Sequence, residues 1–281
     1  MTLSGKARVA GVMGWPIAHS RSPLIHGHWL ARYGIDGAYV PFAVKPENGA
    51  AALRALPKLG FAGTNVTLPH KLTAFDTVDV RDAAATAIGA VNTVVVQADG
   101  SLAGSNTDAP GLLSHLRAEA PAWRAEAAPA AVLGAGGSTR AALFALLAAG
   151  APEIRLANRT RAKAEALAAA FGERVRVVDW AERSDMLADV GLLVNTTSLG
   201  MTGQPPLDIS LDDLSDDAVV YDIVYAPLET DLLAAARMKG AVCVDGLGML
   251  LHQAAPGFAA WFGVQPEVDA ELRDVILADL K

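Results

Sequence analysis

The stretch AAVLGAGGSTRAALFALL, residues 130–147, decides the fold. A short apolar strand leads into Gly134, Gly136 and Gly137, and a helical pattern follows them. Glycines at such a junction permit a tight turn and let backbone N–H groups approach a pyrophosphate at the helix N-terminus. Thr139 stands where the dinucleotide-binding fingerprint has its third glycine, so a glycine-rich turn without a ligand is the alternative interpretation.

The segments around this stretch favour a dinucleotide-binding domain. Six apolar runs read as strands, and they lie at residues 130–136, 153–159, 174–180, 190–197, 218–225 and 241–247. The two clearest helices between them end at Gly150 and Gly172, as helices often do at a C-terminal glycine. Six strands in two βαβαβ halves are what a Rossmann-type doubly wound domain requires. We expect this domain over residues 108–246.

The end of the second of these strands indicates which dinucleotide binds. NAD sites usually carry an acid about 20 residues beyond the glycine-rich turn, where it holds the ribose 2′-hydroxyl. This chain has Asn158, Arg159 and Thr160 there, with Arg161 and Lys163 behind them. An acid would repel a 2′-phosphate, whereas arginine can hold one bidentately. The pattern therefore predicts NADP, and the alternative is a solvated, basic start of a helix.

The first part of the chain also alternates strands with helices. Strands are predicted at residues 7–14, 38–44 and 62–68, helices at 22–34 and 46–60, and a hairpin turning at Asp99-Gly100 within 92–108. Two more predicted helices, 248–263 and 266–280, close the chain. Such alternation predicts an α/β fold with mainly parallel sheets. We expect an N-terminal α/β substrate domain at residues 1–107.

Four polar clusters of this first part are candidates for a ligand site. They are HSRSP (19–23), NVTLPHK (65–71), AVNT (90–93) and SNTD (105–108). Three of the four follow or end a predicted strand, which is where ligands bind in parallel α/β sheets. Taken singly, each cluster could instead have a structural role, as a helix cap or a turn, or carry an ordinary surface lysine. Together they offer hydroxyls, amides, one cation and one anion, a set suited to a small polyhydroxylated acid.

The stretch NVTLPHKL, residues 65–72, mixes apolar and polar side chains. Val66, Leu68 and Leu72 read as core residues. Because successive side chains of a strand point to opposite faces, Asn65 and Thr67 are expected on the side away from Val66 and Leu68. The proline that follows is expected to end the strand and to present the lysine at its carboxyl end.

Composition excludes several classes of protein. A net charge of −7 argues against a general binder of nucleic acid or of anionic membranes. Cys243 is the single cysteine, which rules out an intramolecular disulfide and a cysteine-rich zinc site and favours a reducing cytoplasm. His26 and His28 lie two residues apart and would not share a helix face, so no metal is expected. No signal-peptide core or membrane span is evident. The chain is expected to be soluble, as a monomer or a homodimer.

The chain resembles the shikimate dehydrogenase family over nearly its whole length. The resemblance rests on motifs in register: GWPIAHSRSPLIH (14–26), GTNVTLPHK (63–71), GAVNT (89–93), GSNTDAPG (104–111), GAGGSTRA (134–141), NRTRAKA (158–164), NTTSLGM (195–201), YDIVYAPLET (221–230) and GLGMLLHQA (246–254). It implies reversible, NADPH-dependent reduction of 3-dehydroshikimate to shikimate in the biosynthesis of aromatic amino acids. It also implies that the C-terminal helices, 247–281, pack back on the N-terminal domain.

The resemblance also assigns roles to single residues. Lys71 and Asp108 would form the catalytic pair. The implied substrate contacts are Ser20 and Ser22 to the carboxylate, Thr67, Asn92 and Gln253 to the ring hydroxyls, and Tyr225 beside the ring. The implied cofactor contacts are Gly134, Ala135, Gly136, Gly137, Ser138, Asn158, Arg159, Thr160 and Lys163, with Thr197, Met201 and Gly246 near the nicotinamide. Departures from the family pattern are Gly27, where asparagine is common, and Ser138-Thr139, where small alanine-type residues are usual.

Two alternatives stay open at the level of the sequence. Quinate/shikimate and aminoshikimate dehydrogenases share the scaffold and differ in cofactor preference and in a few binding residues. A non-catalytic regulator that binds shikimate-type ligands belongs to a different class, and likeness of fold alone does not exclude it. Arg159 favours NADP and hence a biosynthetic enzyme, and the presence of both Lys71 and Asp108 argues against a regulator.

Overall fold

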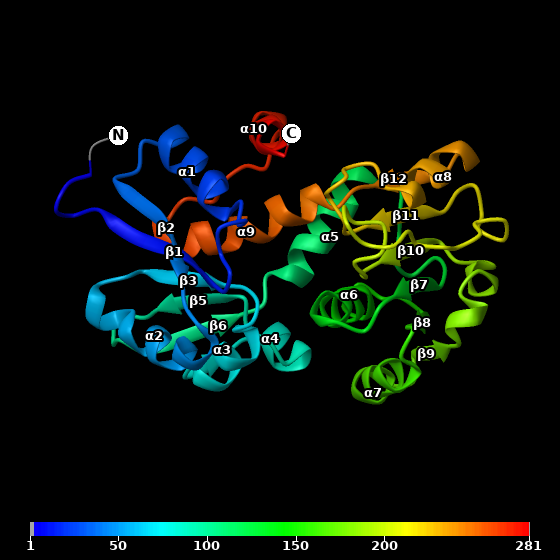
Figure 1. The fold of residues 1–281 in the computed structure, drawn as a ribbon, viewed down its shortest axis with the longest axis horizontal. Helices are drawn as coiled ribbons and strands as arrows, with labels where there is room; N and C mark the ends of the chain where they lie inside the picture. Colours follow the sequence, from blue (N-terminus) through cyan, green and yellow to red (C-terminus); the bar gives the residue numbers. More distant parts are fainter. Residues whose placement is uncertain (1–2, 281) are drawn as a thin grey trace. The chain divides into compact units, whose positions relative to one another are not determined.

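The computed structural model describes residues 3–280 and divides them into two compact units. Unit 1 holds the chain up to Thr107 and again from Leu251 onward, so it is discontinuous in sequence. Unit 2 holds the continuous segment Asp108–Leu250. In Figure 1 the colours of unit 1 run from blue through cyan and return as orange and red, whereas those of unit 2 run from green through yellow to orange.

Unit 1 is built on a mixed sheet of six strands. They are β1 (Arg8–Gly14), β2 (Gly37–Ala43), β3 (Gly63–Val66), β4 (Val80–Arg81), β5 (Thr93–Val96) and β6 (Leu102–Ser105). Their order across the sheet is β2-β1-β3-β5-β6-β4. β1 runs parallel to β2 and β3, and β5 runs antiparallel to its two neighbours, β3 and β6. The predicted hairpin is therefore confirmed as β5–β6.

The direction of β5 brings four connections to one edge of this sheet. Val66, at the end of β3, is level with Met13 near the end of β1. Thr93, at the start of β5, pairs with Asn65 on one side and with Ser105, the last residue of β6, on the other. The chain after β1, after β3, before β5 and after β6 therefore leaves the sheet at the same edge. We call it the polar edge of unit 1.

Six helices belong wholly or mostly to unit 1. They are α1 (Ser22–Arg32), α2 (Gly49–Ala55), α3 (Lys71–Thr77), α4 (Ala83–Ile88), α9 (Leu247–Phe262) and α10 (Ala270–Asp279). The single helix predicted at 46–60 is wrong, since it is split into α2 and two flanking 3-10 turns. Pro57 lacks the N–H that would continue α2. Neither α3 nor α4 was predicted from the sequence.

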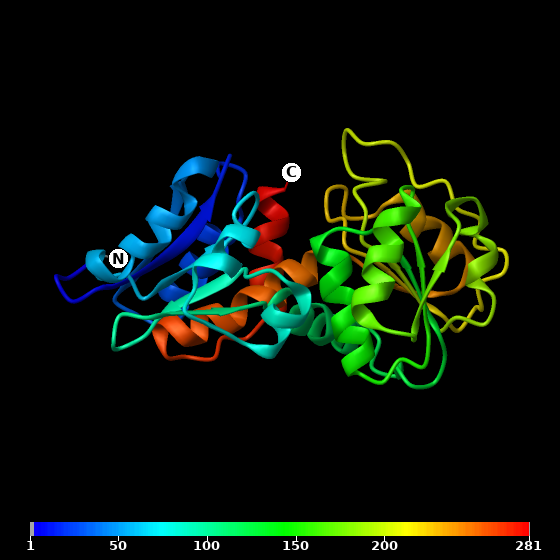
Figure 2. The same ribbon diagram turned by 90° about the horizontal axis from the view of Figure 1, so that it is seen from below.

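Aromatic side chains fasten α1 and α9 to the sheet of unit 1. The rings of Trp29 and Phe258 meet edge to face with centroids 5.3 Å apart. The indole of Trp261 donates a hydrogen bond of 3.0 Å to the carbonyl of Val94 on β5. Figures 1 and 2 both show α9 running along this sheet. Large buried rings of this kind supply much of the burial energy of a core.

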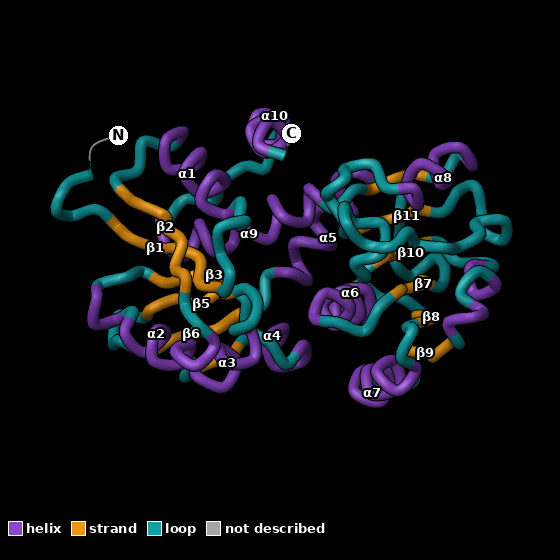
Figure 3. Tube along the Cα trace, in the orientation of Figure 1, coloured by secondary structure: helices purple, strands orange, loops and turns teal. Residues whose placement is uncertain are grey.

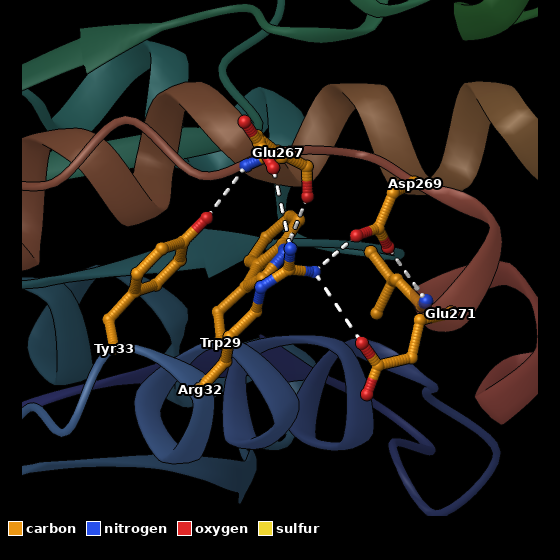
Figure 4. A network of polar contacts seen from close by, with 7 residues as sticks. Trp29, Arg32, Tyr33, Glu267, Asp269 and Glu271 are labelled. Atoms are coloured by element: carbon orange, nitrogen blue, oxygen red, sulfur yellow. Dashed lines mark hydrogen bonds and ion pairs between the residues drawn. The ribbon is translucent and has the colours of Figure 1, made fainter.

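The segment before α10 is attached to α1 by a second set of contacts (Figure 4). Trp29 donates its indole N–H to the carbonyl of Glu267 at 2.9 Å, and the hydroxyl of Tyr33 accepts from the amide of Glu267 at 3.0 Å. Arg32 pairs with the carboxylates of Glu267 and Asp269. The end of the chain is thus tied to the helix that follows β1.

Unit 2 is a doubly wound sheet of six parallel strands. They are β7 (Ala130–Leu133), β8 (Ile154–Ala157), β9 (Val175–Val178), β10 (Leu192–Asn195), β11 (Val219–Asp222) and β12 (Val242–Val244), drawn in orange in Figure 3. Their order is β12-β11-β10-β7-β8-β9, so the winding reverses between β7 and β10. Its helices are α5 (Asp108–Glu119), α6 (Gly137–Ala148), α7 (Arg161–Phe171) and α8 (Asp231–Lys239). All six predicted strands and the α/β class are confirmed.

The prediction for two leucines of NVTLPHKL is wrong. Leu68 is 74% exposed and Leu72 is 66% exposed, although Val66 is buried as expected. β3 ends at Val66, so the alternation of a strand no longer applies to Leu68. α3 starts at Lys71, and Leu72 lies on its outer side. Asn65 is buried as well, because both faces of this central strand are covered.

Candidate active site

Five predicted site residues gather along the polar edge of unit 1. They are Ser20, Ser22, Thr67, Lys71 and Asn92. Ser20 and Ser22 follow β1, Thr67 and Lys71 follow β3, and Asn92 precedes β5. In a parallel α/β arrangement this is the edge at which ligands bind. Asp108 comes directly after Thr107, which leaves the same edge from β6, and it is the first, buried residue of α5.

A buried histidine sets the position of Lys71. His70 is the residue before α3, and its amide donates to the carbonyl of Thr67 at 2.9 Å. Its Nε2 lies 2.7 Å from the carbonyl of Val44, which can only accept, so Nε2 carries the proton. The imidazole is buried, and its hydrogen bond to Val44 holds the chain before α3 in place. The backbone of Lys71, the first residue of α3, is fixed with it.

Asn92 ties the start of β5 to the chain just before Asp108. Its Oδ1 accepts from the amide of Thr107 at 2.9 Å and from the hydroxyls of Thr93 and Thr107 at 3.0 and 3.2 Å. Its own carbonyl accepts from the amide of Val66 at 2.7 Å. The backbone carbonyl and the side chain of Asn92 therefore join β3, β5 and the chain that follows β6. The orientation of Asn92 is determined by these bonds.

A buried polar layer beneath the polar edge was not predicted from the sequence. The hydroxyl of Tyr39 donates to Oδ1 of Asn65 at 2.6 Å, and Nδ2 of Asn65 donates to the hydroxyl of Thr93 at 3.1 Å. Burial raises the pKa of Tyr39 well above its ordinary value, and a hydrogen bond with Ser22 opposes that rise. Tyr39 thus connects with residues of two of the polar clusters. The only signal in the sequence was Asn65, a polar residue inside an apolar strand.

Neither serine of HSRSP is the N-cap of α1, which was the alternative interpretation of these residues. Arg21 occupies the N-cap, without a side-chain cap bond. The hydroxyl of Ser20 accepts from the amide of Ser22 at 3.3 Å. Arg21 donates to the carbonyl of His19 at 3.0 Å and pairs with Asp279 of α10 at 2.5 Å. The hydroxyl of Ser22, which is buried, forms a hydrogen bond with Tyr39.

The glycine-rich turn of unit 2 joins β7 to α6 as predicted. Gly134 has φ of +118°, and a Cβ there would lie 2.6 Å from the hydroxyl of Thr196. Thr139, at the place of the third glycine, is buried, accepts from the amide of Gly136 at 2.9 Å and contacts the Thr196 hydroxyl at 2.7 Å. Cβ positions on Gly136 and Gly137 would meet no atom within 4 Å. There is thus open space next to the Cα atoms of Gly136 and Gly137.

Two arginines that follow β8, Arg159 and Arg161, differ in their ion pairs. Arg161 pairs with Glu165 at 2.8 Å and with Asp179 at 2.5 Å. Within residues 3–280 no carboxylate forms an ion pair with Arg159, which is exposed. Asn158 donates to the carbonyl of Thr160 at 2.9 Å, which shapes the turn into α7. Arg159 is therefore the guanidinium that remains available for an anion, and Lys163 is exposed one turn further on.

The remaining predicted residues of unit 2 follow β10, β11 and β12. Thr197 donates to Oδ1 of Asn195 from its amide at 3.0 Å and from its hydroxyl at 2.8 Å. Met201 is exposed on the same loop. Gly246 approaches the end of β11 so closely that a Cβ would lie 2.1 Å from the carbonyl oxygen of Ile223. Tyr225, half-buried, lies on the loop after β11, and Gln253, also half-buried, lies on α9 in unit 1.

Metal and membrane chemistry find no support in the part of the chain that is described. Across residues 3–280, no three His, Cys, Asp or Glu side chains cluster as metal ligands would. No helix over that same range is long and apolar enough to cross a membrane. The predicted residues of the candidate site offer hydroxyls, amides, a lysine, a carboxylate and backbone N–H groups.

Comparison with known proteins places this chain among the shikimate dehydrogenases. Three family descriptions match: "Shikimate dehydrogenase substrate binding domain" at residues 12–94, "Shikimate / quinate 5-dehydrogenase" at 118–201 and "Shikimate 5'-dehydrogenase C-terminal domain" at 246–270. A shikimate dehydrogenase (NADP⁺) of Paramagnetospirillum magneticum is 58% identical over 276 residues, covering 98% of this chain and 100% of that protein. One of Rhodospirillum rubrum is 59% identical over 279 residues, covering 98% and 99%.

Solved structures agree with these sequence matches. The shikimate 5-dehydrogenase of Thermus thermophilus, in complex with NADP(H) and shikimate, has a TM-score of 0.85 at 36% identity, covering 96% of this chain and 99% of that one. The quinate dehydrogenase of Corynebacterium glutamicum, in complex with NAD, has a TM-score of 0.89 at 32% identity, covering 97% and 99%. Identity above half over nearly the full length of both chains, as with the two curated relatives, establishes kinship. This chain belongs to the shikimate dehydrogenase family.

Proposed function

We propose that this protein catalyses the reversible, NADPH-dependent reduction of 3-dehydroshikimate to shikimate, in the biosynthesis of aromatic amino acids. The observation that carries the proposal is the polar edge of unit 1, where Lys71 and four hydroxyl or amide side chains lie along one edge of the sheet. The full-length relatives named as NADP⁺ enzymes of this type support the same conclusion.

The side chains of the polar edge match the groups of this substrate. Ser20 and Ser22 donate hydroxyl hydrogen bonds to its carboxylate, which can accept several at once. Ring hydroxyls are held by Thr67, Asn92 and Gln253, and Tyr225 lies beside the ring. The side chain of Asn92 is already held in one orientation by its bonds to Thr93 and Thr107. It therefore loses little conformational entropy when it binds the substrate.

Lys71 and Asp108 handle the proton of the reaction. NADPH supplies the hydride, which adds to the carbonyl carbon of the substrate. The electron pair of the C=O bond moves to oxygen, and Lys71 donates a proton to that oxygen. The carboxylate of Asp108 directs the ammonium group of Lys71 and accepts a hydrogen bond from a neighbouring substrate hydroxyl. In the oxidative direction Lys71 takes the proton back.

The residues of unit 2 fit the cofactor. The turn Gly134, Ala135, Gly136, Gly137 and Ser138 binds the pyrophosphate. The amides of Gly134 and Gly136 already donate to the carbonyl of Ala157 and the hydroxyl of Thr139, so the N–H groups offered to the phosphates are those of Ala135, Gly137 and Ser138. Arg159 holds the 2′-phosphate together with Asn158, Thr160 and Lys163. Arg159 suits this role because no carboxylate within residues 3–280 neutralises it. Thr197, Met201 and Gly246 line the nicotinamide end.

These roles divide the chain into two domains. We assign substrate binding to residues 1–107 with the C-terminal helices 247–281, and cofactor binding to residues 108–246. The compact units change at Thr107 and at Leu250, close to these limits. A cytoplasmic location and a monomeric or homodimeric state remain predictions from the sequence.

A quinate dehydrogenase is the second candidate, because such a protein with NAD matches the fold at a TM-score of 0.89. One assay separates the two. The purified chain is given shikimate or quinate, each with NADP⁺ or NAD⁺, and the absorbance of the reduced cofactor is followed. We expect the highest kcat/KM for shikimate with NADP⁺. A higher value for quinate with NAD⁺ contradicts the proposal, and binding of shikimate and NADP⁺ without turnover indicates a regulator.

A further inference from the structure

One buried carboxylate in unit 2 has no role in the site as described so far. Asp222 is the last residue of β11 and is 0% exposed. Its Oδ1 accepts from Nδ2 of Asn195 at 2.9 Å and from the amide of Val224 at 3.0 Å, and its Oδ2 accepts from the hydroxyl of Thr230 at 2.7 Å. Within residues 3–280 no cationic side chain pairs with it. It accepts hydrogen bonds from three uncharged donors, on Asn195, Val224 and Thr230, and we call this group the Asp222 junction.

The bond to Asn195 determines the shape of the loop after β10. Because Nδ2 of Asn195 donates to Asp222, its Oδ1 is turned toward Thr197 and accepts from both the amide and the hydroxyl of that residue. The hydroxyl of Thr197 in turn accepts from the amide of Leu199 at 3.0 Å. Reversing the amide of Asn195 would break these bonds to Thr197. The conformation of this loop therefore depends on Asp222.

The bond to Val224 supports the approach of the chain after β12. The carbonyl of Val224 accepts from the amide of Gly246 at 3.2 Å. Since a Cβ on Gly246 would lie 2.1 Å from the carbonyl oxygen of Ile223, the two backbones are already in close contact. A shift of residues 223–224 would displace Gly246 with it.

The bond to Thr230 closes the loop that carries Tyr225. Thr230 is the N-cap of α8, and its hydroxyl accepts from the amide of Leu233 at 3.3 Å while donating to Asp222. The segment 224–230 is therefore held at both ends by the same carboxylate. The chain after β10 joins it, since the amide of Thr202 donates to the carbonyl of Ala226 at 2.8 Å.

A carboxylate suits this junction better than its uncharged analogue. An ionised carboxyl accepts at both oxygens, whereas an asparagine amide would present an NH₂ group to one of the three donors. Burial raises the pKa of Asp222, and its three hydrogen bonds oppose that rise. An unpaired buried carboxyl is costly unless it is fully hydrogen-bonded, so removal of its donors or of the group itself would disturb the whole junction.

We infer that Asp222 is a positioning residue for the nicotinamide end of the cofactor, acting through Thr197, Tyr225 and Gly246. The inference rests on the proposed function, which assigns those three residues to the nicotinamide and substrate. The adenosine end lies on the turns after β7 and β8, to which Asp222 makes no hydrogen bond. Asp222 therefore acts mainly on the nicotinamide end. Its one link to the glycine-rich turn is indirect, through Thr196, the residue after Asn195, whose hydroxyl lies 2.7 Å from that of Thr139.

The test compares the whole cofactor with its adenosine end alone. Dissociation constants of NADPH and of adenosine 2′,5′-bisphosphate are measured by fluorescence or calorimetry for the wild type and for Asp222→Ala. We expect the variant to bind NADPH at least about 10-fold more weakly and to lose up to about 10²-fold in kcat, since misplacement of about 1 Å has effects of that size. Binding of the bisphosphate should change by less than about 2-fold, because its partners on β7 and β8 are untouched.

Two further variants separate positioning from a loss of folding. Asp222→Asn keeps one acceptor oxygen and loses only the bond from Thr230, so it should recover most of the NADPH affinity. Arg155→Ala is the matched control in the same unit: Arg155 donates to the carbonyl of Met186 at 2.9 Å, near the amino ends of the strands. It should lower stability without changing the ratio of the two dissociation constants.

Two outcomes overturn the inference. If Asp222→Ala weakens NADPH and the bisphosphate equally, the residue is merely structural. If it weakens neither, the junction has no effect on the cofactor. Failure of the wild type to oxidise shikimate would instead reject the proposed function, and the ratio of dissociation constants would still decide the role of Asp222.

Discussion

The imidazole of His26 lies flat against the phenol ring of Tyr39, with ring centroids 3.8 Å apart and an interplanar angle of 4°. Trp29 and Trp261 also surround the imidazole, at centroid distances of 5.6 and 5.7 Å. The pair lies directly beneath the polar edge, since Tyr39 donates to Asn65. Because the imidazole is fully buried, removal from water favours its neutral form.

This environment makes the stability of the protein depend on pH. Burial lowers the pKa of His26 from 6.5 to about 3, and neither ring nitrogen has a hydrogen-bond partner within residues 3–280 that would stabilise the charged form. Below pH 6.5 the unfolded chain binds a proton that the folded chain does not, so acid favours unfolding. The contribution of His26 to the free energy of unfolding should fall by about 1.4 kcal/mol per pH unit between the two pKa values and stay constant above them.

Urea unfolding of His26→Phe and of the wild type, from about pH 7.5 to about pH 4.5, measures this contribution as a difference. We expect the stability of the wild type to fall relative to that of His26→Phe as the pH falls below about 6.5, because phenylalanine fills the same aromatic surroundings and takes up no proton on unfolding. The exposed His19, replaced by Gln, should leave the pH dependence as in the wild type. Parallel curves for His26→Phe and the wild type would contradict the assignment.

Tyr39→Phe removes the hydroxyl that donates to Asn65. The buried Oδ1 of Asn65 then loses its donor, which should cost about 1–3 kcal/mol of unfolding free energy. Because Asn65 also donates to Thr93, beside Asn92, we expect the KM for shikimate to rise about 3- to 10-fold with a smaller change in kcat. Chemical unfolding and steady-state kinetics measure the two effects.

Tyr33→Phe is the matched control for this variant. Its hydroxyl accepts from the amide of Glu267 at 3.0 Å, on the outer side of α1 (Figure 4). The same atom is deleted in the same unit, away from the polar edge. Its KM for shikimate should equal that of the wild type, and an equal rise in both variants would show that the effect does not pass through Asn65.

Arg159→Ala should weaken NADPH far more than NADH. Loss of a hydrogen bond to a charged group costs about 1.5–3 kcal/mol, so the KM for NADPH should rise by about 10- to 150-fold. Arg161→Ala is the control, because the guanidinium of Arg161 is already held by Glu165 and Asp179. It should cost much less. Equal losses for NADPH and NADH in Arg159→Ala would show that Arg159 does not read the 2′-phosphate.

The strands of unit 2 could be predicted because each is a short, mainly apolar run. Five of the six are followed by a polar or glycine residue, and β11 ends in Asp222. Both faces of a parallel sheet are covered, so its strands carry few polar residues, and β7 and β10 are buried throughout. The short helices α3 and α4 could not be predicted, since six or seven residues give too little periodicity. Leu68 and Leu72 were misjudged because exposure depends on where a strand stops.

The residues that line the candidate site could be predicted from the sequence, whereas the residues that hold them in place could not. Polar residues at strand ends, such as Lys71 and Asn92, stand out against apolar neighbours. Tyr39, Asp222 and Thr230 do not, because their roles come from tertiary contacts. Asp222 meets Asn195 only because β10 and β11 are adjacent in the sheet. Register between strands, rather than local pattern, creates such networks.

The most direct test of the proposed function is the rate of NADP⁺ reduction with shikimate by the wild type and by Lys71→Ala. We predict that the wild type turns over and that the variant loses about 10²–10⁴-fold in kcat, as is usual for a lost general acid–base group, while its dissociation constant for NADPH is unchanged. Lys58→Ala, in the turn after α2, should behave as the wild type. Turnover by Lys71→Ala close to that of the wild type would contradict the catalytic role of Lys71.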